Sequence, residues 1–286
     1  MGYPVTLLIV GGGHRGCGYA AFAKKHPELA RVVGVAEPRE FYRRKLTQEH
    51  GIVPENVFTD WRQAAGRKRF ADAVIIATQD RQHTEPAVAF AGLGYDMLLE
   101  KPMANTEADC RKIAAAVKES GILFAVCHVL RYTDYTRRLK AILDEGRIGR
   151  IVSIQHLEPV GYWHQAHSFV RGNWRNESES SFMLLAKSCH DLDWLRHVMG
   201  KPMRRVSSFG SLMHFRRDDR PAGAADRCLD CGVEAQCPYS ARRIYLERFR
   251  AGHTGWPVDV ITSDLTEAGV TAALRDGPYG RCVYAC

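Results

Sequence analysis

Short runs of consecutive apolar residues alternate with longer, helix-compatible segments along the first half of the chain. A continuous apolar run is typical of a strand that is buried on both faces of a parallel sheet. Strands that alternate with helices predict an α/β fold with a doubly wound parallel sheet. The predicted strands are residues 5–10, 32–36, 72–77, 95–99 and 123–127, and the predicted helices are residues 14–26, 39–50, 84–92, 106–120 and 134–145.

The pattern changes after residue 150, where apolar and polar positions begin to alternate partially. Such alternation is typical of a sheet with one exposed face. We therefore place a domain boundary near Gly149, which gives a first domain of residues 1–149. The second domain, residues 150–286, is predicted to contain strands at 151–158 and 205–215, helices at 181–199 and 240–250, and a cysteine-rich insertion around 216–240.

A glycine-rich turn joins the first predicted strand to the first predicted helix. Its frame, Gly11-x-Gly13-x-x-Gly16, fits a dinucleotide-binding turn. The first glycine permits the tight turn, the second lets a pyrophosphate approach the backbone, and the third lets the helix pack on the strand. Phosphates would then bind at the positive end of the helix dipole. His14 and Arg15 lie inside this frame and are included among the predicted cofactor-binding residues.

An acidic residue follows the second predicted strand and indicates which cofactor binds. Glu37 lies 21 residues beyond Gly16, where a carboxylate would bind the adenine ribose hydroxyls. A carboxylate there repels a 2′-phosphate, so we predict NAD. Arg39 and Arg43 lie close by, which keeps NADP as an alternative.

Polar residues follow the later strands at the same predicted edge of the sheet. Because the carboxyl ends of parallel strands meet at one edge, we expect these residues to share a crevice with the glycine turn. They comprise residues 78–83, then Glu100-Lys101-Pro102, and then His128 with Arg131. The predicted cofactor-binding residues among them are Thr78, His83, Glu100 and Lys101.

These motifs together resemble the glucose–fructose oxidoreductase/inositol dehydrogenase/rhizopine-catabolism (Gfo/Idh/MocA) family. The resemblance covers residue 4 to roughly residue 214 and includes His190-Asp191-x-Asp193 on a predicted helix. It implies an N-terminal Rossmann domain, followed by an α+β domain with an open, mostly antiparallel sheet that often mediates oligomerisation. It also implies nicotinamide-dependent oxidation or reduction of a hydroxyl or carbonyl on a sugar, cyclitol or related polyol.

The sequence departs from the family pattern in two places. Many members carry an aspartate four residues before the histidine, where this chain has Ala186, followed by Lys187. Members also usually continue with strands that complete the second sheet, so we expect a C-terminally short member with a partial second domain. A homo-oligomer is expected if that domain is complete.

Two residues are the predicted catalytic pair. His190 is the candidate general base, because the ordinary pKa of histidine lies near neutral pH. Lys101 would donate a hydrogen bond to the same substrate oxygen and stabilise its developing negative charge. Aromatic, amide and cationic groups crowd residues 162–175, which would suit a polyhydroxylated ring or, equally, a domain interface. The predicted substrate-binding residues are His128, Arg131, Trp163, His164, His167, Arg171 and Lys187.

The spacing Cys228-x2-Cys231-x5-Cys237 indicates a metal site in the second domain. Thiolates at this spacing can bind one structural zinc, with Cys282 or Cys286 as the fourth ligand. An iron–sulfur cluster uses the same ligands, and disulfides or free thiols are further alternatives.

Composition narrows the class of protein. The 286 residues are 45% apolar and 25% charged, which is ordinary for a globular protein. The net charge of +8 suits an anionic ligand, but the arginines form no basic tail, so we expect no nucleic-acid partner. With no apolar run of membrane-spanning length and no signal-peptide pattern, we expect a cytoplasmic protein without a membrane partner. An NAD-dependent glycoside hydrolase and a catalytically silent NAD-binding protein remain alternatives to a dehydrogenase.

Overall fold

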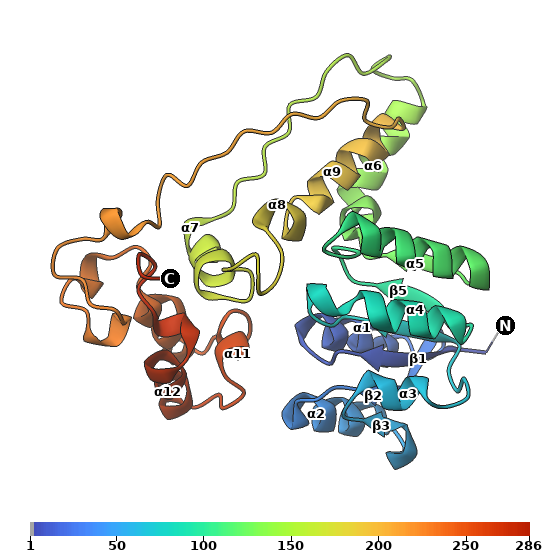
Figure 1. The fold of residues 1–286 in the computed structure, drawn as a ribbon, viewed down its shortest axis with the longest axis horizontal. Coiled ribbons are helices and arrows are strands. Elements are labelled where there is room, and N and C mark those ends of the chain that lie inside the picture. The colour runs from blue at the N-terminus through green and yellow to red at the C-terminus, as the bar shows by residue number, and fades with distance from the viewer. Residues whose placement is uncertain (1–2) are drawn as a thin grey trace. The chain divides into compact units, whose positions relative to one another are not determined.

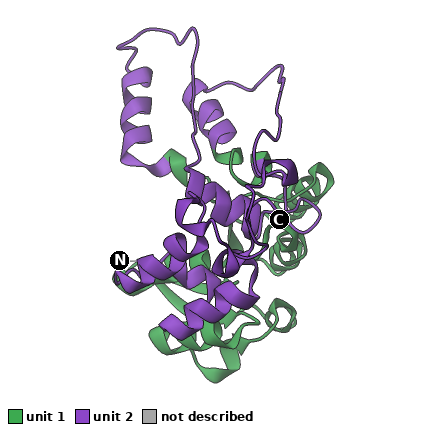
Figure 2. Cartoon of the chain, turned by 90° about the vertical axis from the view of Figure 1, so that its left-hand side faces the viewer, with its two compact units in different colours: residues 1–131, 184–190 green, residues 132–183, 191–286 purple. Residues whose placement is uncertain are grey.

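The computed structural model describes residues 3–286 and divides the chain into two compact units (Figure 2). Unit 1 comprises residues 1–131 and 184–190, and unit 2 comprises residues 132–183 and 191–286. This division differs from the expected boundary near Gly149. Helix α6 (Asp134–Asp144) belongs to unit 2, where the buried Thr136 Oγ1 accepts a hydrogen bond from Trp194 Nε1 at 2.9 Å.

A six-stranded, wholly parallel sheet forms the centre of unit 1 (Figure 1). Its strand order is β3-β2-β1-β4-β5-β6, so the order reverses between β1 and β4. Ligands of such sheets bind outside the strand ends at this reversal. The strands are β1 (Val5–Val10), β2 (Ala30–Ala36), β3 (Val57–Phe58), β4 (Ala73–Ile76), β5 (Asp96–Leu99) and β6 (Phe124–Val126). The helices are α1 (His14–Lys25), α2 (Glu40–His50), α3 (Trp61–Ala65), α4 (Thr84–Gly92) and α5 (Glu107–Ser120).

Both faces of this sheet are buried, which explains the continuous apolar runs. Successive side chains of a strand point to opposite faces. In β1, Leu8 and Val10 pack with residues of α4 and α5, whereas Ile9 packs with residues of α1 and α2. The predicted doubly wound sheet is therefore confirmed. The two-residue strand β3 and helix α3 were not predicted, because each is too short to produce a periodic pattern.

Unit 2 is helical, and the predicted antiparallel sheet is absent from its described residues. Residues 151–160 and 201–213 carry no strand hydrogen bonds, and Val152 and Phe209 are each 97% exposed. The prediction of strands at 151–158 and 205–215 was wrong for this structure. An alternating pattern specifies which face a strand would bury, but a strand also needs a backbone partner, and neither segment has one.

Short helices take the place of the longer ones predicted in the second half. The predicted helix 181–199 is split at residues 187–188, and the predicted helix 240–250 is mostly π-helix. The helices are α7 (Tyr162–Gln165), a π-helix at Ala166–Arg171, α8 (Met183–Ala186), α9 (Cys189–Met199), a π-helix at Arg242–Glu247, α10 (Arg248–Arg250), α11 (Val258–Ile261) and α12 (Glu267–Asp276).

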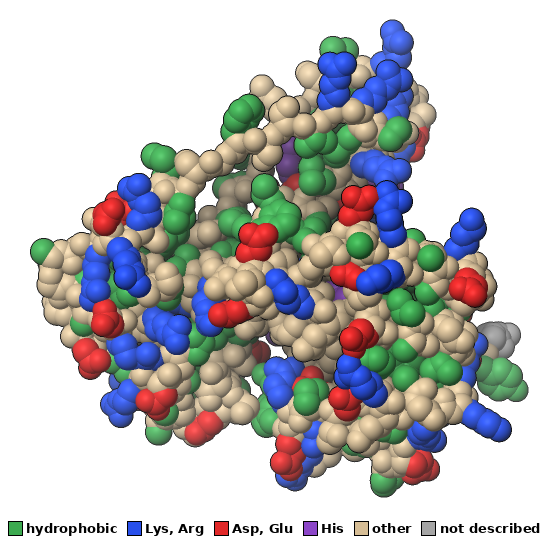
Figure 3. Space-filling view, viewed as in Figure 1, with side chains coloured by type: hydrophobic (Ala, Val, Ile, Leu, Met, Phe, Trp, Pro, Cys, Tyr) green, Lys and Arg blue, Asp and Glu red, His purple; other side chains and the backbone are tan. Residues whose placement is uncertain are grey.

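No helix among residues 3–286 is both long and apolar enough to cross a membrane. On the face shown in Figure 3, lysine and arginine side chains are interspersed with acidic side chains rather than gathered in one band.

Candidate functional site

Two glycines of the turn between β1 and α1 have no room for a side chain. Gly11 has a φ of +91°, and a Cβ there would lie 2.5 Å from the carbonyl oxygen of Ala77. A Cβ on Gly16 would lie 2.0 Å from the carbonyl oxygen of Gly11. Both neighbours are backbone atoms, so neither clash can be relieved by a side-chain rotation. Helix α1 starts at His14 with Gly13 as its N-cap, and no side chain caps its first turn. This uncapped, positive helix end fits the pyrophosphate of a dinucleotide.

Glu37 lies at the end of β2 and is only 1% exposed. Its Oε2 accepts a hydrogen bond from the Gly12 N–H at 2.7 Å, which joins the carboxylate to the glycine turn. Its Oε1 accepts from Arg39 Nε at 2.7 Å, and Arg39 Nη2 donates to Oε2 at 3.0 Å. Burial opposes ionisation, but the hydrogen bonds from Arg39 outweigh it and lower the pKa of Glu37. The carboxylate is therefore ionised beside the predicted adenosine position.

The predicted site residues after β4, Thr78 and His83, bind backbone carbonyl oxygens of the chain. His83 is 1% exposed, and its ring nitrogens contact the carbonyl oxygens of Pro102 at 2.8 Å and Thr78 at 3.2 Å. Thr78 Oγ1 donates to the Gln82 carbonyl at 3.2 Å. Their position at the sheet edge agrees with the expected crevice, and His83 ties this turn to the residue after Lys101.

Glu100 and its neighbours form a second buried carboxylate site at the end of β5. Tyr19 of α1 donates to Glu100 Oε1 at 2.7 Å, and the Lys101 N–H donates to Oε2 at 3.0 Å. Arg15 Nε lies 3.8 Å from Glu100 Oε1 and is largely exposed. Sequence reasoning missed Tyr19, although its position one turn after the glycine frame could have indicated it.

Lys101 and His190 lie close together within unit 1. Lys101 Nζ donates a hydrogen bond to the carbonyl oxygen of Ala186 at 2.9 Å, and Ala186 precedes His190 by four residues. Because a backbone carbonyl accepts this bond, the contact does not depend on the side chain at position 186. The His128 and His190 rings meet edge to face, with centroids 5.8 Å apart.

His190 is a neutral imidazole at physiological pH. Burial, together with the positive charge of Lys101, lowers its pKa to about 4. Its Nδ1 is buried and has no hydrogen-bond partner within residues 3–286. A neutral ring with an unbonded nitrogen can exchange a proton with a bound hydroxyl group. The half-buried His128, Arg131 and Lys187 belong to the same unit.

The other predicted substrate residues belong to unit 2, and two of them are in its interior. His167 is 3% exposed and its Nδ1 contacts Tyr245 Oη at 2.9 Å. Arg171 is 1% exposed and donates to backbone carbonyls. Trp163 packs beneath the guanidinium of Arg248, 4.5 Å from its ring centroid, and beside Trp256, which also contacts the ring of His164. Substrate binding by these four residues stays a prediction.

All nine cysteines, which lie within the described residues, are free thiols. The predicted ligands Cys228, Cys231, Cys237 and Cys282 line one cavity in unit 2, although no close group of three sulfurs is formed. Cys286 is not part of that lining; its Sγ lies 3.3 Å from the Cys282 carbonyl oxygen.

Both halves of the chain match models of known protein families. Residues 5–128 match the family model described as "Oxidoreductase family, NAD-binding Rossmann fold", and residues 136–240 match the "GFO/IDH/MocA C-terminal domain". The 2,7-anhydro-N-acetylneuraminate hydratase of Escherichia coli is 27% identical over 206 residues, covering 72% of this chain and 52% of that protein. The levoglucosan dehydrogenase of Pseudarthrobacter phenanthrenivorans is 28% identical over 231 residues, covering 78% and 57%.

The crystal structure of myo-inositol 2-dehydrogenase from Lactobacillus plantarum has the same fold. Its TM-score is 0.60 at 22% identity, covering 69% of this chain and 57% of the other. The chain spans about half the length of the curated relatives it matches, 51% and 52% for two of them. The glycine turn, Glu37 and Lys101 lie within the residues that match the first family model, and His190 lies within those that match the second. The chain belongs to the Gfo/Idh/MocA family of oxidoreductases.

Proposed function

We propose that this protein is an NAD-dependent dehydrogenase that acts on a hydroxyl or carbonyl of a sugar, cyclitol or related polyol. The observation that carries the proposal is the neighbourhood of Lys101 and His190, in the same unit as a glycine turn that excludes side chains. When a nicotinamide oxidises an alcohol, a neutral histidine can take the hydroxyl proton and a neighbouring cation can stabilise the developing negative charge. The named dehydrogenase relatives support the substrate class.

Each residue of the pair would act on one oxygen atom of the substrate. NAD, when bound, supplies the hydride acceptor. The substrate carbon would lose a hydride, while its hydroxyl proton passes to His190. Lys101 would donate a hydrogen bond to that oxygen and stabilise the negative charge that develops as the proton leaves. The reverse sequence reduces a carbonyl, with His190 returning the proton.

Glu37 supports NAD rather than NADP. Its buried, ionised carboxylate would repel a 2′-phosphate, and it already engages the guanidinium of Arg39, the group best suited to bind that phosphate. Both effects would lower the affinity for NADP as long as Glu37 and Arg39 remain paired.

A reaction without net oxidation is the second candidate. The 27% identical relative is named a hydratase rather than a dehydrogenase. Transient oxidation by bound NAD followed by elimination, as proposed for NAD-dependent glycoside hydrolases, would use the same two residues. Accumulation of NADH during turnover supports the dehydrogenase, whereas bond cleavage with no net NADH supports this alternative.

The Lys101→Ala substitution tests the catalytic assignment. In a screen of sugars, cyclitols and polyols for NADH absorbance, we expect kcat/KM on the best substrate to fall by roughly 10²–10³-fold, the effect of removing an oxyanion donor. Lys118→Ala, at an exposed position near the end of α5, is the matched control and should leave the rate unchanged. Equal oxidation by wild type and Lys101→Ala would refute the role of Lys101.

The pH profile tests His190. Because the base must be neutral, we expect kcat/KM to persist as the pH falls below 6.5 and to drop only near the lowered pKa of about 4. NMR titration of the His190 ring should give the same midpoint, and Lys101→Met should raise it by removing a nearby positive charge. A midpoint of 6.5 in the wild-type protein would contradict this account.

The Glu37→Ala substitution tests cofactor choice. Removing the carboxylate releases Arg39, so we expect the affinity for NADP⁺ relative to NAD⁺ to rise by about tenfold or more, which corresponds to about 1.4 kcal/mol. Calorimetric titration with both dinucleotides measures the ratio. The Glu37→Ala, Arg39→Ala double variant should lose the gain; the same gain without Arg39 would show that the arginine is not involved.

The glycine turn is tested by a pair of alanine substitutions in one helix. Gly16→Ala places a Cβ against the Gly11 carbonyl and should weaken NAD⁺ binding by at least about tenfold. Gly18→Ala is the control, because a Cβ there meets nothing within 4 Å. Titration calorimetry and circular dichroism separate lost binding from lost folding. Unchanged affinity in folded Gly16→Ala would exclude this turn as the pyrophosphate site.

A further inference from the structure

A cavity of about 330 Å³ in unit 2 is lined by four cysteines that come from two distant parts of the chain. Cys228, Cys231 and Cys237 belong to one loop, and Cys282 lies 45 residues or more further along. Nothing in the proposed dehydrogenase chemistry uses these thiols. Their convergence therefore calls for a separate explanation.

Successive tight turns hold the first three cysteines at the bends of the loop. The N–H of Cys231 donates to the Cys228 carbonyl at 3.5 Å, and the N–H of Glu234 donates to the Cys231 carbonyl at 3.3 Å. The N–H of Cys237 then donates to Glu234, and that of Ser240 donates to Cys237. Each bond spans three residues, so the loop turns back repeatedly over a short length. Metal-binding cysteine loops need this compactness.

Backbone pairing brings the fourth cysteine to the loop. Arg227 and Arg281 form an isolated antiparallel bridge, and the Cys282 N–H donates to the Asp226 carbonyl at 2.8 Å. Cys228 Sγ lies 4.0 Å from the Arg281 carbonyl oxygen. Cys228 and Cys282 therefore each directly follow a residue of this bridge. Both side chains are buried.

A buried guanidinium borders the cavity and has no carboxylate partner in residues 3–286. Arg171 is 1% exposed, and its Nη2 lies 3.3 Å from Cys228 Sγ. Its other hydrogen bonds go to the carbonyl oxygens of Arg281 and Tyr239. Its Nη1 is buried and has no hydrogen-bond partner among the described residues. An uncompensated buried cation is costly, so the cavity is suited to a group of net negative charge.

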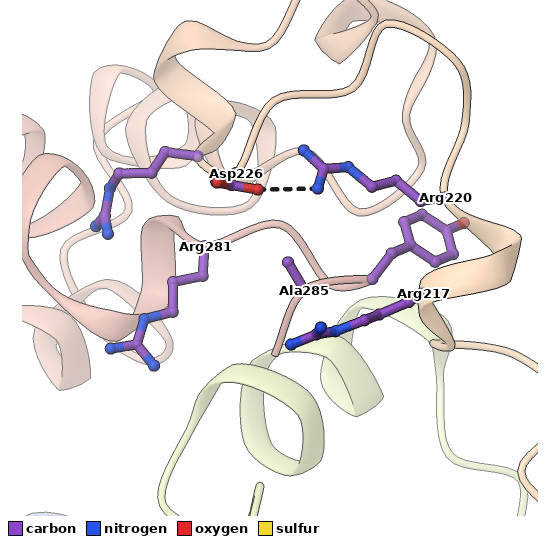
Figure 4. A pocket seen from close by; sticks show the side chains of 7 residues that line it. Arg217, Arg220, Asp226, Arg281 and Ala285 are labelled. Atoms are coloured by element: carbon purple, nitrogen blue, oxygen red, sulfur yellow. Dashed lines mark ion pairs between the residues drawn. The ribbon is translucent and has the colours of Figure 1, made fainter.

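The neighbouring surface is also positive. A second pocket of about 690 Å³ is lined by Arg217, Arg220, Arg227 and Arg281, and shares Tyr284 with the cysteine cavity (Figure 4). Asp226, which pairs with Arg220 at 2.8 Å, is the acidic residue of that lining. Positive charge beside the cavity would stabilise a bound group of net negative charge.

Burial raises the pKa of the Cys237 thiol, despite the opposing charge of Arg171. A metal ion that binds cysteine displaces the thiol proton and is held by the thiolate.

We propose that Cys228, Cys231, Cys237 and Cys282 bind one Zn²⁺ as a closed, structural tetrathiolate site. Four thiolates around one divalent ion carry a net negative charge, which Arg171 would compensate. Binding releases the thiol protons to solvent, so zinc affinity rises with pH. With four protein ligands no coordination position is left for water or substrate, and the site would hold the two cysteine segments together.

Binding requires the cysteine side chains to rotate. Among residues 3–286, the ligand atoms of His156, Glu158 and Asp191 form the one group of three within 4.8 Å of one another. That group lies partly on the exposed segment 151–160, and its His156–Asp191 contact is already a 2.8 Å pair. The cysteine sulfurs would have to approach one another to tetrahedral spacing when the ion binds.

Metal analysis of the purified full chain tests the proposal. We expect about one zinc per chain, as for other Cys₄ sites. Cobalt substitution should give the visible absorption of tetrahedral thiolate ligation. Cys231→Ser should lower the bound zinc several-fold, whereas Cys286→Ser, which changes a nearby thiol outside the cavity, should retain it.

A second measurement avoids dependence on variants that fail to fold. Alkylation of the wild-type protein, followed by peptide mass spectrometry, should show zinc-dependent protection of the four cavity thiols and none of Cys110 in α5. Equal labelling with and without added Zn²⁺, in protein that contains no zinc, would overturn the proposal. Iron with inorganic sulfide in the purified protein would also overturn it, in favour of an iron–sulfur cluster.

Discussion

The approach of Gly16 to the Gly11 carbonyl is the contact on which the cofactor site depends. A side chain at either position would meet backbone atoms at 2.0–2.5 Å, so α1 can reach β1 only with glycine there. That packing brings the first turn of α1 to the carboxyl end of β1, beside the reversal of strand order. The Gly12 N–H of the same turn donates to Glu37, so the predicted phosphate and ribose positions adjoin the same stretch of backbone.

Charge arrangement distinguishes the two ends of this site. At the adenosine end, a buried carboxylate stays ionised because Arg39 and a backbone N–H bind it. At the other end, Lys101 stands beside a histidine that burial and positive charge keep neutral. The first arrangement can select a dinucleotide, and the second can move a proton without an acidic partner. The carbonyl oxygen of Ala186 accepts a hydrogen bond from Lys101 Nζ.

Sequence patterns predicted the first unit well because its strands are buried on both faces. Leu8, Ile9 and Val10 form an unbroken apolar run in β1, and the glycine frame and Glu37 then locate the turn. The patterns failed where structure depends on a partner that periodicity does not encode. Val152 and Phe209 lie in segments without a pairing strand, and no sequence pattern indicated that Arg171 lies in the interior beside Cys228. Arg39 was read as a nearby charge, but its bidentate bond to Glu37 needed the fold.

The most direct test of the central claim is a crystal structure of the protein with NAD⁺ bound. We expect the pyrophosphate against the first turn of α1, the adenine ribose hydroxyls at Glu37, and the nicotinamide beside Lys101 and His190. A dinucleotide bound elsewhere with the glycine turn empty, or Lys101 and His190 both remote from the nicotinamide ring, would contradict the account.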